Sequence, residues 1–160
     1  MTLFSLKMNR LTLGLGIALA FSIAPMAHAE DGEYGVLMKT LANPFWGAMS
    51  KGVEDGAKEA GIKYFLQAAE NDQAAEPQLN LCNTMLERKP VAMITAAINS
   101  TNLLPCLKTA QDAGIKVVDL DGNLDPAVLD KEGIKITFRI GSDNVAAGGQ
   151  AAEYLASKLG

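Results

Sequence analysis

The chain has 160 residues, of which 49% are hydrophobic and 20% are charged, and its formal net charge is −4. That balance is typical of a globular protein and excludes a disordered or collagen-like chain. The acidic balance also argues against a nucleic-acid-binding protein, which concentrates Lys and Arg on one face to neutralise phosphates.

The first 29 residues are organised like a secretory signal peptide. Lys7 and Arg10 form a basic start without acids, residues 11–25 are an apolar run, and residues 27–29 supply the small side chains that precede a cleavage site. The apolar run, about 15 residues, is shorter than the roughly 20 that a membrane-spanning helix needs. We therefore expect export, with cleavage after Ala29.

Removal of this leader changes the chemistry open to the chain. It leaves 131 residues, and because the leader holds two of the 14 basic residues and none of the 18 acidic ones, the net charge becomes −6. The only histidine, His28, leaves with the leader, which excludes Ser-His-Asp and Cys-His catalysis and the commonest zinc ligand. Phosphate-cradling glycine motifs and calcium-type acidic spacings are absent as well. We expect no metal and no cofactor.

After the leader, short apolar strands alternate with amphipathic helices. In chain order, the pattern predicts a strand at 34–40, a helix at 44–60, a strand at 63–69, a helix at 73–88, a strand at 91–97, a helix at 101–113, a strand at 115–121, one helical turn at 126–130, a strand at 134–141 and a helix at 144–159. This alternation predicts an α/β fold, a doubly wound parallel sheet of about five strands with helices on both faces. No linker interrupts it, so residues 30–160 are expected to form one domain.

In such a sheet, ligands bind beyond the carboxyl ends of the strands. The segment Asn43-Pro44-Phe45-Trp46 follows the first strand and opens the first helix. One interpretation is structural, with Asn43 capping the helix and the aromatic rings fixing it to the sheet. The other is a sugar site, in which the rings stack on C–H faces and Asn43 hydrogen-bonds the hydroxyls.

Three charged residues lie near the ends of the first and fourth strands. Lys39 either extends to the surface or points into the polar crevice. Asp119 and Asp121 are two apart in a strand and are expected on the same side, which suggests the paired carboxylates of a small exported glycoside hydrolase. We favour Asp121 as an acceptor for sugar hydroxyls, because such neighbouring positions lie closer than the roughly 5 Å that separates catalytic carboxylates.

From residue 34 to residue 160 the chain resembles the amino-terminal lobe of bacterial periplasmic sugar-binding proteins of the ribose and allose type. The resemblance rests on five features in the family's order: Lys39-Thr40-Leu41, Asn43-Pro44-Phe45-Trp46, Gly52 with Ala57, Asp119-Leu120-Asp121 and Ser142-Asp143-Asn144. It implies ligand contacts at Lys39, Asn43, Phe45, Trp46 and Asp121. Lysine with a Phe-Trp pair is closest to the D-allose-binding branch, and Gly122 stands where ribose-type members carry an arginine, which argues against ribose.

The resemblance implies a periplasmic monomer that binds a monosaccharide without turnover and delivers it to the membrane permease of an ABC importer. The alternatives are a sensing role, with a chemoreceptor as partner or a furanosyl signal as ligand, and the exported glycoside hydrolase that uses Asp119 and Asp121. Members of this family have two lobes, so residues 30–160 correspond to the amino-terminal lobe. We expect the chain to be a fragment that binds sugar weakly by itself.

Cys82 and Cys106 are the two cysteines, and an exported protein reaches a compartment where they can form a bridge. In the strand order 2-1-3-4-5 expected for this fold, the helices at 73–88 and 101–113 run side by side on one face of the sheet. Both cysteines fall on the inward faces of these helices. The pattern is therefore compatible with a disulfide and with two buried thiols.

Overall fold

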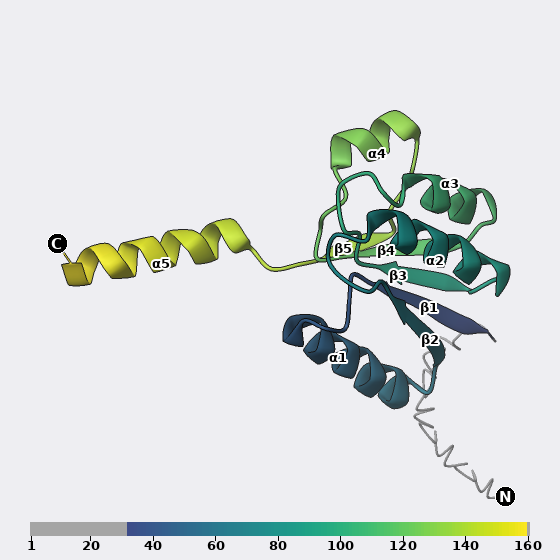
Figure 1. The fold of residues 1–160 in the computed structure, drawn as a ribbon, viewed down its shortest axis with the longest axis horizontal. Helices are drawn as coiled ribbons and strands as arrows, with labels where there is room; N and C mark the ends of the chain where they lie inside the picture. The colour runs from purple at the N-terminus through teal and green to yellow at the C-terminus, as the bar shows by residue number, and fades with distance from the viewer. Residues whose placement is uncertain (1–31, 160) are drawn as a thin grey trace, which may run out of the picture.

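The computed structural model describes residues 32–159, and the leader predicted at 1–29 lies outside them. These residues form a five-stranded parallel sheet flanked by helices (Figure 1). Its strands are β1 (Glu33–Met38), β2 (Lys63–Ala68), β3 (Ala92–Thr95), β4 (Lys116–Leu120) and β5 (Phe138–Ile140). They lie in the order β2-β1-β3-β4-β5, which confirms the predicted fold class and strand order.

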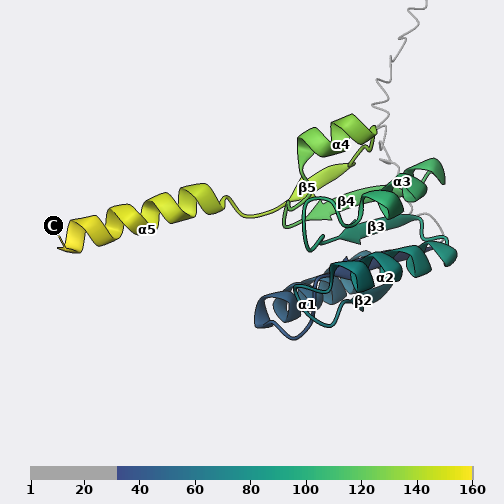
Figure 2. The ribbon, with the colours of Figure 1, turned by 45° about the horizontal axis from the view of Figure 1, so that its top comes forward.

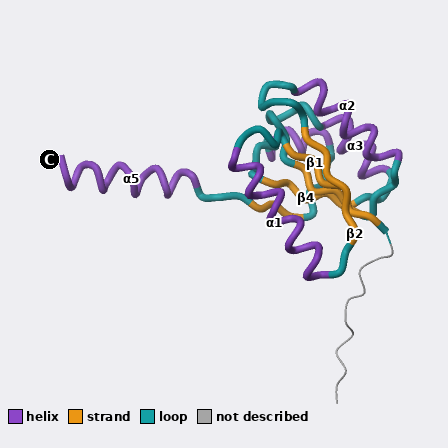
Figure 3. Tube along the Cα trace, turned by 60° about the horizontal axis from the view of Figure 1, so that its bottom comes forward, coloured by secondary structure: helices purple, strands orange, loops and turns teal. Residues whose placement is uncertain are grey.

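The helices are α1 (Pro44–Ala60), α2 (Ala75–Glu87), α3 (Leu104–Asp112), α4 (Pro126–Glu132) and α5 (Asn144–Leu159). Helix α1 covers one face of the sheet and α2, α3 and α4 cover the other (Figure 1 and Figure 3). Right-handed crossovers explain this division, because the connection from β1 to β2 runs one way along the sheet and the later connections run the other way. The two directions diverge between β1 and β3, which is the topological switch point of the sheet. None of the described helices has both the length and the apolarity required to span a bilayer.

The main core lies between the sheet and the three helices α2, α3 and α4. It is filled by buried apolar side chains, including Leu37, Met85, Met93, Leu103, Leu107, Val117, Leu124 and Leu129. A smaller core lies under α1 and consists of Trp46, Ala96 and Leu120. Helix α1 itself buries only Trp46 and Ala57, so its attachment to the sheet depends mainly on the indole ring.

Cys82 and Cys106 form a disulfide that joins α2 to α3, with their Cα atoms 6.1 Å apart. Both residues are fully buried in the main core. The sequence was compatible with a disulfide and with two buried thiols, and the structure contains the disulfide.

The fifth strand is shorter than the predicted segment 134–141. Helix α4 ends at Glu132 and is capped by Gly133, which has a φ of 65°. The next residue, Ile134, is 5% exposed and packs into the main core instead of joining the sheet. The apolar run is therefore divided, and only Phe138–Ile140 pairs with β4.

Helix α5 stands apart from the sheet. It projects away from the rest of the protein after residues 141–143 (Figure 1 and Figure 2), and none of its residues is buried. Most of its apolar positions are Ala or Gly, which offer little surface to bury against a sheet. Within the described residues the compact body thus ends at Ile140, and the helix expected to complete the same domain lies outside it.

Candidate functional site

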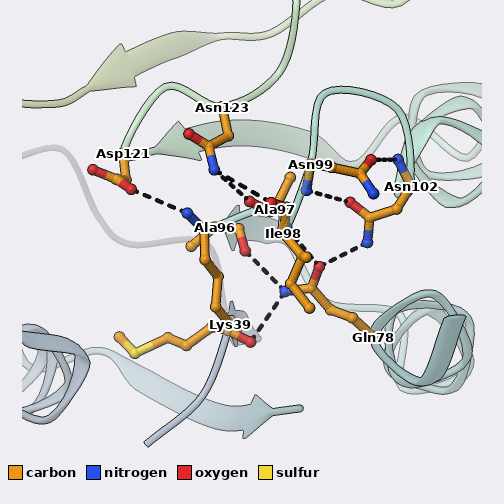
Figure 4. Close-up of polar contacts among 10 residues, drawn as sticks. Lys39, Gln78, Ala96, Ala97, Ile98, Asn99, Asn102, Asp121 and Asn123 are labelled. Carbon is orange, nitrogen blue, oxygen red and sulfur yellow. Dashed lines mark hydrogen bonds and ion pairs between the residues drawn. The ribbon is translucent and has the colours of Figure 1, made fainter. Parts of the chain in front are cut away.

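The carboxyl ends of β1 and β4 bring together two of the predicted residues. Lys39 follows β1 and Asp121 follows β4, on either side of β3. Lys39 Nζ lies 3.2 Å from Asp121 Oδ2 (Figure 4), although 82 residues separate them in the chain. The two side chains are only 11% and 23% exposed. The lysine therefore points into the crevice at the switch point of the sheet and not to the surface.

Asp121 reaches this position through a sharp change in the backbone. Strand β4 ends at Leu120, and Asp121 and Gly122 have φ angles of 68° and 63°. Asp is one of the few residues besides glycine that adopt this left-handed conformation at modest cost. The Asp121 N–H donates to the carbonyl of Ile140 at 2.7 Å, which ties the turn to the end of β5. Asp121 therefore belongs to the turn after β4 and not to the regular alternation of side chains along the strand.

Asp119 occupies a different environment from Asp121. It is fully buried within β4 and lies opposite Arg139 of β5, whose Nε is 3.5 Å from Asp119 Oδ2. Neither carboxylate oxygen has a hydrogen-bond partner among the described residues. Asp121, by contrast, lies beyond the end of β4, in the left-handed turn, and its carboxylate is 23% exposed. The two carboxylates therefore differ in burial and in partner: Asp119 pairs with Arg139 and Asp121 with Lys39.

Burial raises the pKa of Asp119 above its usual value, and the Arg139 guanidinium opposes this effect only in part. An acid whose pKa is higher in the folded than in the unfolded state binds its proton more readily when folded. The contribution of Asp119 to the free energy of unfolding therefore falls as the pH rises through the raised pKa. Above that pH the ionised carboxylate is a destabilising group.

We predict that Asp119→Asn stabilises the protein near neutral pH by about 1 kcal/mol, the low end of the cost of a buried polar group whose hydrogen bonds are unsatisfied, because Arg139 offsets only part of the cost of burying the charge. Urea unfolding between about pH 4 and pH 7 should show an advantage of the variant that grows with pH. The exposed residue Asp72, changed to Asn, controls for the loss of one negative charge. An advantage that is the same at every pH, or a less stable variant, would contradict the prediction.

The two neighbouring aromatic residues have different roles in the structure. Asn43 Oδ1 accepts a hydrogen bond of 3.0 Å from the Phe45 N–H and so caps α1. Trp46 is 3% exposed in the core under α1, whereas Phe45 is 50% exposed. Their rings meet edge to face, with centroids 4.9 Å apart. Trp46 and the Asn43 oxygen therefore have the structural roles of fixing and capping α1. Of the two aromatic rings, Phe45 is the one exposed to a ligand.

Lys39 also contacts the buried indole. Its Nζ lies 5.0 Å from the centroid of the Trp46 ring, within the range of a cation–π interaction. The ammonium group is therefore held between an aromatic face and the Asp121 carboxylate. Such a partly buried arrangement fixes the long side chain in one position.

Two surface cavities lie near the ends of the strands. One, about 470 Å³, adjoins the site at the ends of β1 and β2 and is lined mainly by polar residues: Thr40, Ala42, Asn43, Pro44, Asn71, Asp72 and Gln73. A larger one, about 630 Å³, lies at the opposite edge of the sheet, where Val91 and Ile115 precede β3 and β4. It is remote from Lys39 and Asp121. Within residues 32–159 no group of His, Cys, Asp or Glu side chains is placed to hold a metal ion.

Three polar residues lie behind the Lys39–Asp121 pair. Asn102 and Asn123 belong to the segments 96–102 and 121–123 that follow β3 and β4, where ligands are expected to bind, whereas Gln78 of α2 was not predicted (Figure 4). The helical spacing of Gln78 could have indicated that its side chain is buried. It lies four residues before Cys82 and seven before Met85, on the face of α2 that enters the core.

A family model for a periplasmic binding protein domain matches residues 34–160. The D-allose-binding periplasmic protein of Escherichia coli (strain K12) is 34% identical over 147 residues, which are 92% of this chain and 46% of that protein. The D-ribose/D-allose-binding protein of Pseudomonas aeruginosa is 31% identical over 158 residues, 94% of this chain and 49% of that protein.

The fold comparison gives the same relationship. An ABC transporter periplasmic solute binding protein from Actinobacillus succinogenes, solved with bound D-allose, matches with a TM-score of 0.75 and 32% identity. The match covers 81% of this chain and 45% of that one. The chain therefore spans about half the length of the curated relatives it matches.

Proposed function

The chain belongs to the periplasmic binding protein family, and from that membership we propose that it forms the amino-terminal, ligand-binding lobe of a receptor for a monosaccharide of the allose type. The observation that carries the proposal is the Lys39–Asp121 ion pair beside the exposed ring of Phe45, at the switch point of the sheet. The receptor would act in the periplasm after cleavage behind Ala29, as a monomer that delivers sugar to the permease of an ABC importer. The E. coli relative, a D-allose-binding periplasmic protein, supports this assignment.

Each group of the site suits one part of a sugar. The half-exposed ring of Phe45 offers an apolar surface to the C–H face of a pyranose. The Asp121 carboxylate accepts hydrogen bonds from hydroxyls strongly because it is charged, and the Lys39 ammonium has donors beyond the one directed at Asp121. Asn43 uses its oxygen to cap α1, which leaves its amide nitrogen to donate. Trp46 would support Lys39 and Phe45 from below.

These groups offer stacking and hydrogen bonds, so we propose reversible binding and not turnover. The hydrolase alternative needs Asp119 and Asp121 to act on one bond, and Asp119 is fully buried beside Arg139. The relatives named above are binding proteins, which supports the same choice.

We predict that Phe45→Ala weakens D-allose binding about tenfold, the effect of losing roughly 1.4 kcal/mol of aromatic contact. Because one lobe offers half of a two-lobed site, binding by this chain is expected at a dissociation constant of about 1 mM or weaker. Amide chemical shifts of the isotope-labelled protein, recorded during a D-allose titration, should move at Lys39, Phe45 and Asp121.

Phe138→Ala is the matched control, because Phe138 is 53% exposed on β5 and lies outside the site. It should leave the affinity unchanged. The proposal would be wrong if these amides did not respond to about 100 mM sugar, a hundredfold above the expected constant. Equal losses of affinity in the two variants would also contradict it.

A further inference from the structure

A fully buried carboxamide lies behind the site. Gln78 of α2 is 0% exposed. Its Nε2 donates to the carbonyls of Met38, at 3.1 Å, and Ala96, at 2.8 Å (Figure 4). Its Oε1 accepts from the Ile98 N–H at 3.0 Å and from Asn102 Nδ2 at 2.8 Å. The carboxamide thus uses both of its donors and both lone pairs of its oxygen.

These partners belong to the ends of two neighbouring strands. Met38 is the last residue of β1 and directly precedes Lys39. Ala96 and Ile98 lie in segment 96–98, immediately after β3. Gln78 therefore ties the backbone that carries the lysine to segment 96–98.

The other member of the ion pair is tied to the same segment. Asn123 follows the left-handed turn at Asp121 and Gly122. Its Nδ2 donates to the carbonyl of Ala97 at 3.1 Å and points also toward that of Ile98, at 3.5 Å. Segment 96–98 is consequently the common support of Lys39 and Asp121.

Side chains have to supply this support because the strand ladder ends here. Beyond the last ladder hydrogen bond, buried carbonyl groups still need donors. A glutamine with one fixed orientation supplies two donors and two acceptors at once. Its position therefore sets the distance between the strand ends, and with it the placement of the groups that follow them.

We propose that Gln78 is a positioning residue of the sugar site, which sets the alignment of Lys39 against Asp121 through segment 96–98, with Asn123 fixing the Asp121 side. The inference rests on the proposed function in so far as this ion pair binds the sugar. The alignment itself can be measured without any ligand.

Trp46 provides that measurement. It is the only tryptophan of the chain, and the Lys39 ammonium lies 5.0 Å from its ring centroid. Indole emission responds to the field of a nearby charge, so a displaced ammonium shifts the emission maximum. Lys39→Met, which removes the charge, defines the direction of the shift.

The main variant is Gln78→Glu, which keeps the size of the side chain but replaces the donating amide with an oxygen that faces two carbonyls. We expect its Trp46 emission to shift in the same direction as in Lys39→Met. We also expect a loss of D-allose affinity of about tenfold or more, as for a lost hydrogen bond to a charged group. Gln150→Glu is the matched control, because it makes the same chemical change at an exposed position on α5, away from the site. It should change neither quantity.

Circular dichroism at the temperature of the measurement establishes that each variant is folded. If Gln78→Glu does not fold, Asn123→Asp tests the same support from the Asp121 side, and the same emission shift is expected. Variants that are folded and less stable, but whose Trp46 emission and D-allose response match the wild type, would overturn the inference in favour of a purely structural role. A shifted emission together with a wild-type protein that ignores D-allose would instead reject the proposed function and leave the positioning role of Gln78 standing.

Discussion

Replacement of Cys82 and Cys106 by alanine is expected to lower the free energy of unfolding by about 3.5 kcal/mol. The bridge joins residues 24 apart in the chain, and it restricts the unfolded chain by closing a loop of that size. The loss is a large part of the 5–15 kcal/mol that typically stabilises a domain. Urea denaturation of the oxidised wild type and of the double variant measures the difference.

The wild type denatured in the presence of a thiol reductant is the matched control and should unfold near the midpoint of the double variant. Because both cysteines are fully buried, the reductant should act only as the protein unfolds. Titration of two reactive thiols per chain in denaturant without reductant would refute the bridge. Equal stability of the two proteins would refute its contribution.

Trp46→Ala is expected to cost about 3–5 kcal/mol, the range for removing a buried large aromatic side chain. The effect should be local, because Trp46 and Ala57 are the only buried residues of α1. The indole fills the core against Ala96 and Leu120, and the cavity left by alanine would remove most of the contact between helix and sheet. Hydrogen exchange should therefore show a loss of amide protection concentrated in α1.

Phe45→Ala is the control, because the neighbouring ring is 50% exposed and its removal should change stability by less than about 1 kcal/mol. Helices α2 and α3, which the disulfide joins, should keep their protection in both variants. A uniform loss of protection across all three helices would show that α1 is not attached mainly through Trp46.

The convergence of Lys39 and Asp121 followed from simple rules. Apolar runs and helical spacings located the strands, and the strand order placed the ends of β1 and β4 on either side of β3. The sequence pattern could not predict which side chains at the start of a helix point into the core. Phe45 and Trp46 are adjacent, so they point in directions about 100° apart around the helix, and one enters the core while the other faces solvent.

Three other features lay beyond the sequence pattern. An apolar run such as 134–141 does not reveal whether Ile134 pairs in the sheet or fills the core. Helical spacing identified α5 but says nothing of what covers its apolar face. The role of Gln78 depends on carbonyls that lie 18 and 40 residues away in the chain, which no local pattern contains.

Strand β5 has consequences for how the protein behaves at high concentration. Within the described sheet it pairs only with β4, so its outer row of peptide groups is open to a strand from another molecule. Phe138 and Ile140 are each 53% exposed there, which would favour aggregation. The strand is only three residues long, however, and its middle residue is the charged Arg139, whose side chain projects to the opposite face of the sheet from the two apolar ones. Short length and a charged residue are features by which natural edge strands resist intermolecular pairing, so the arginine that pairs with Asp119 is also expected to limit aggregation through this edge.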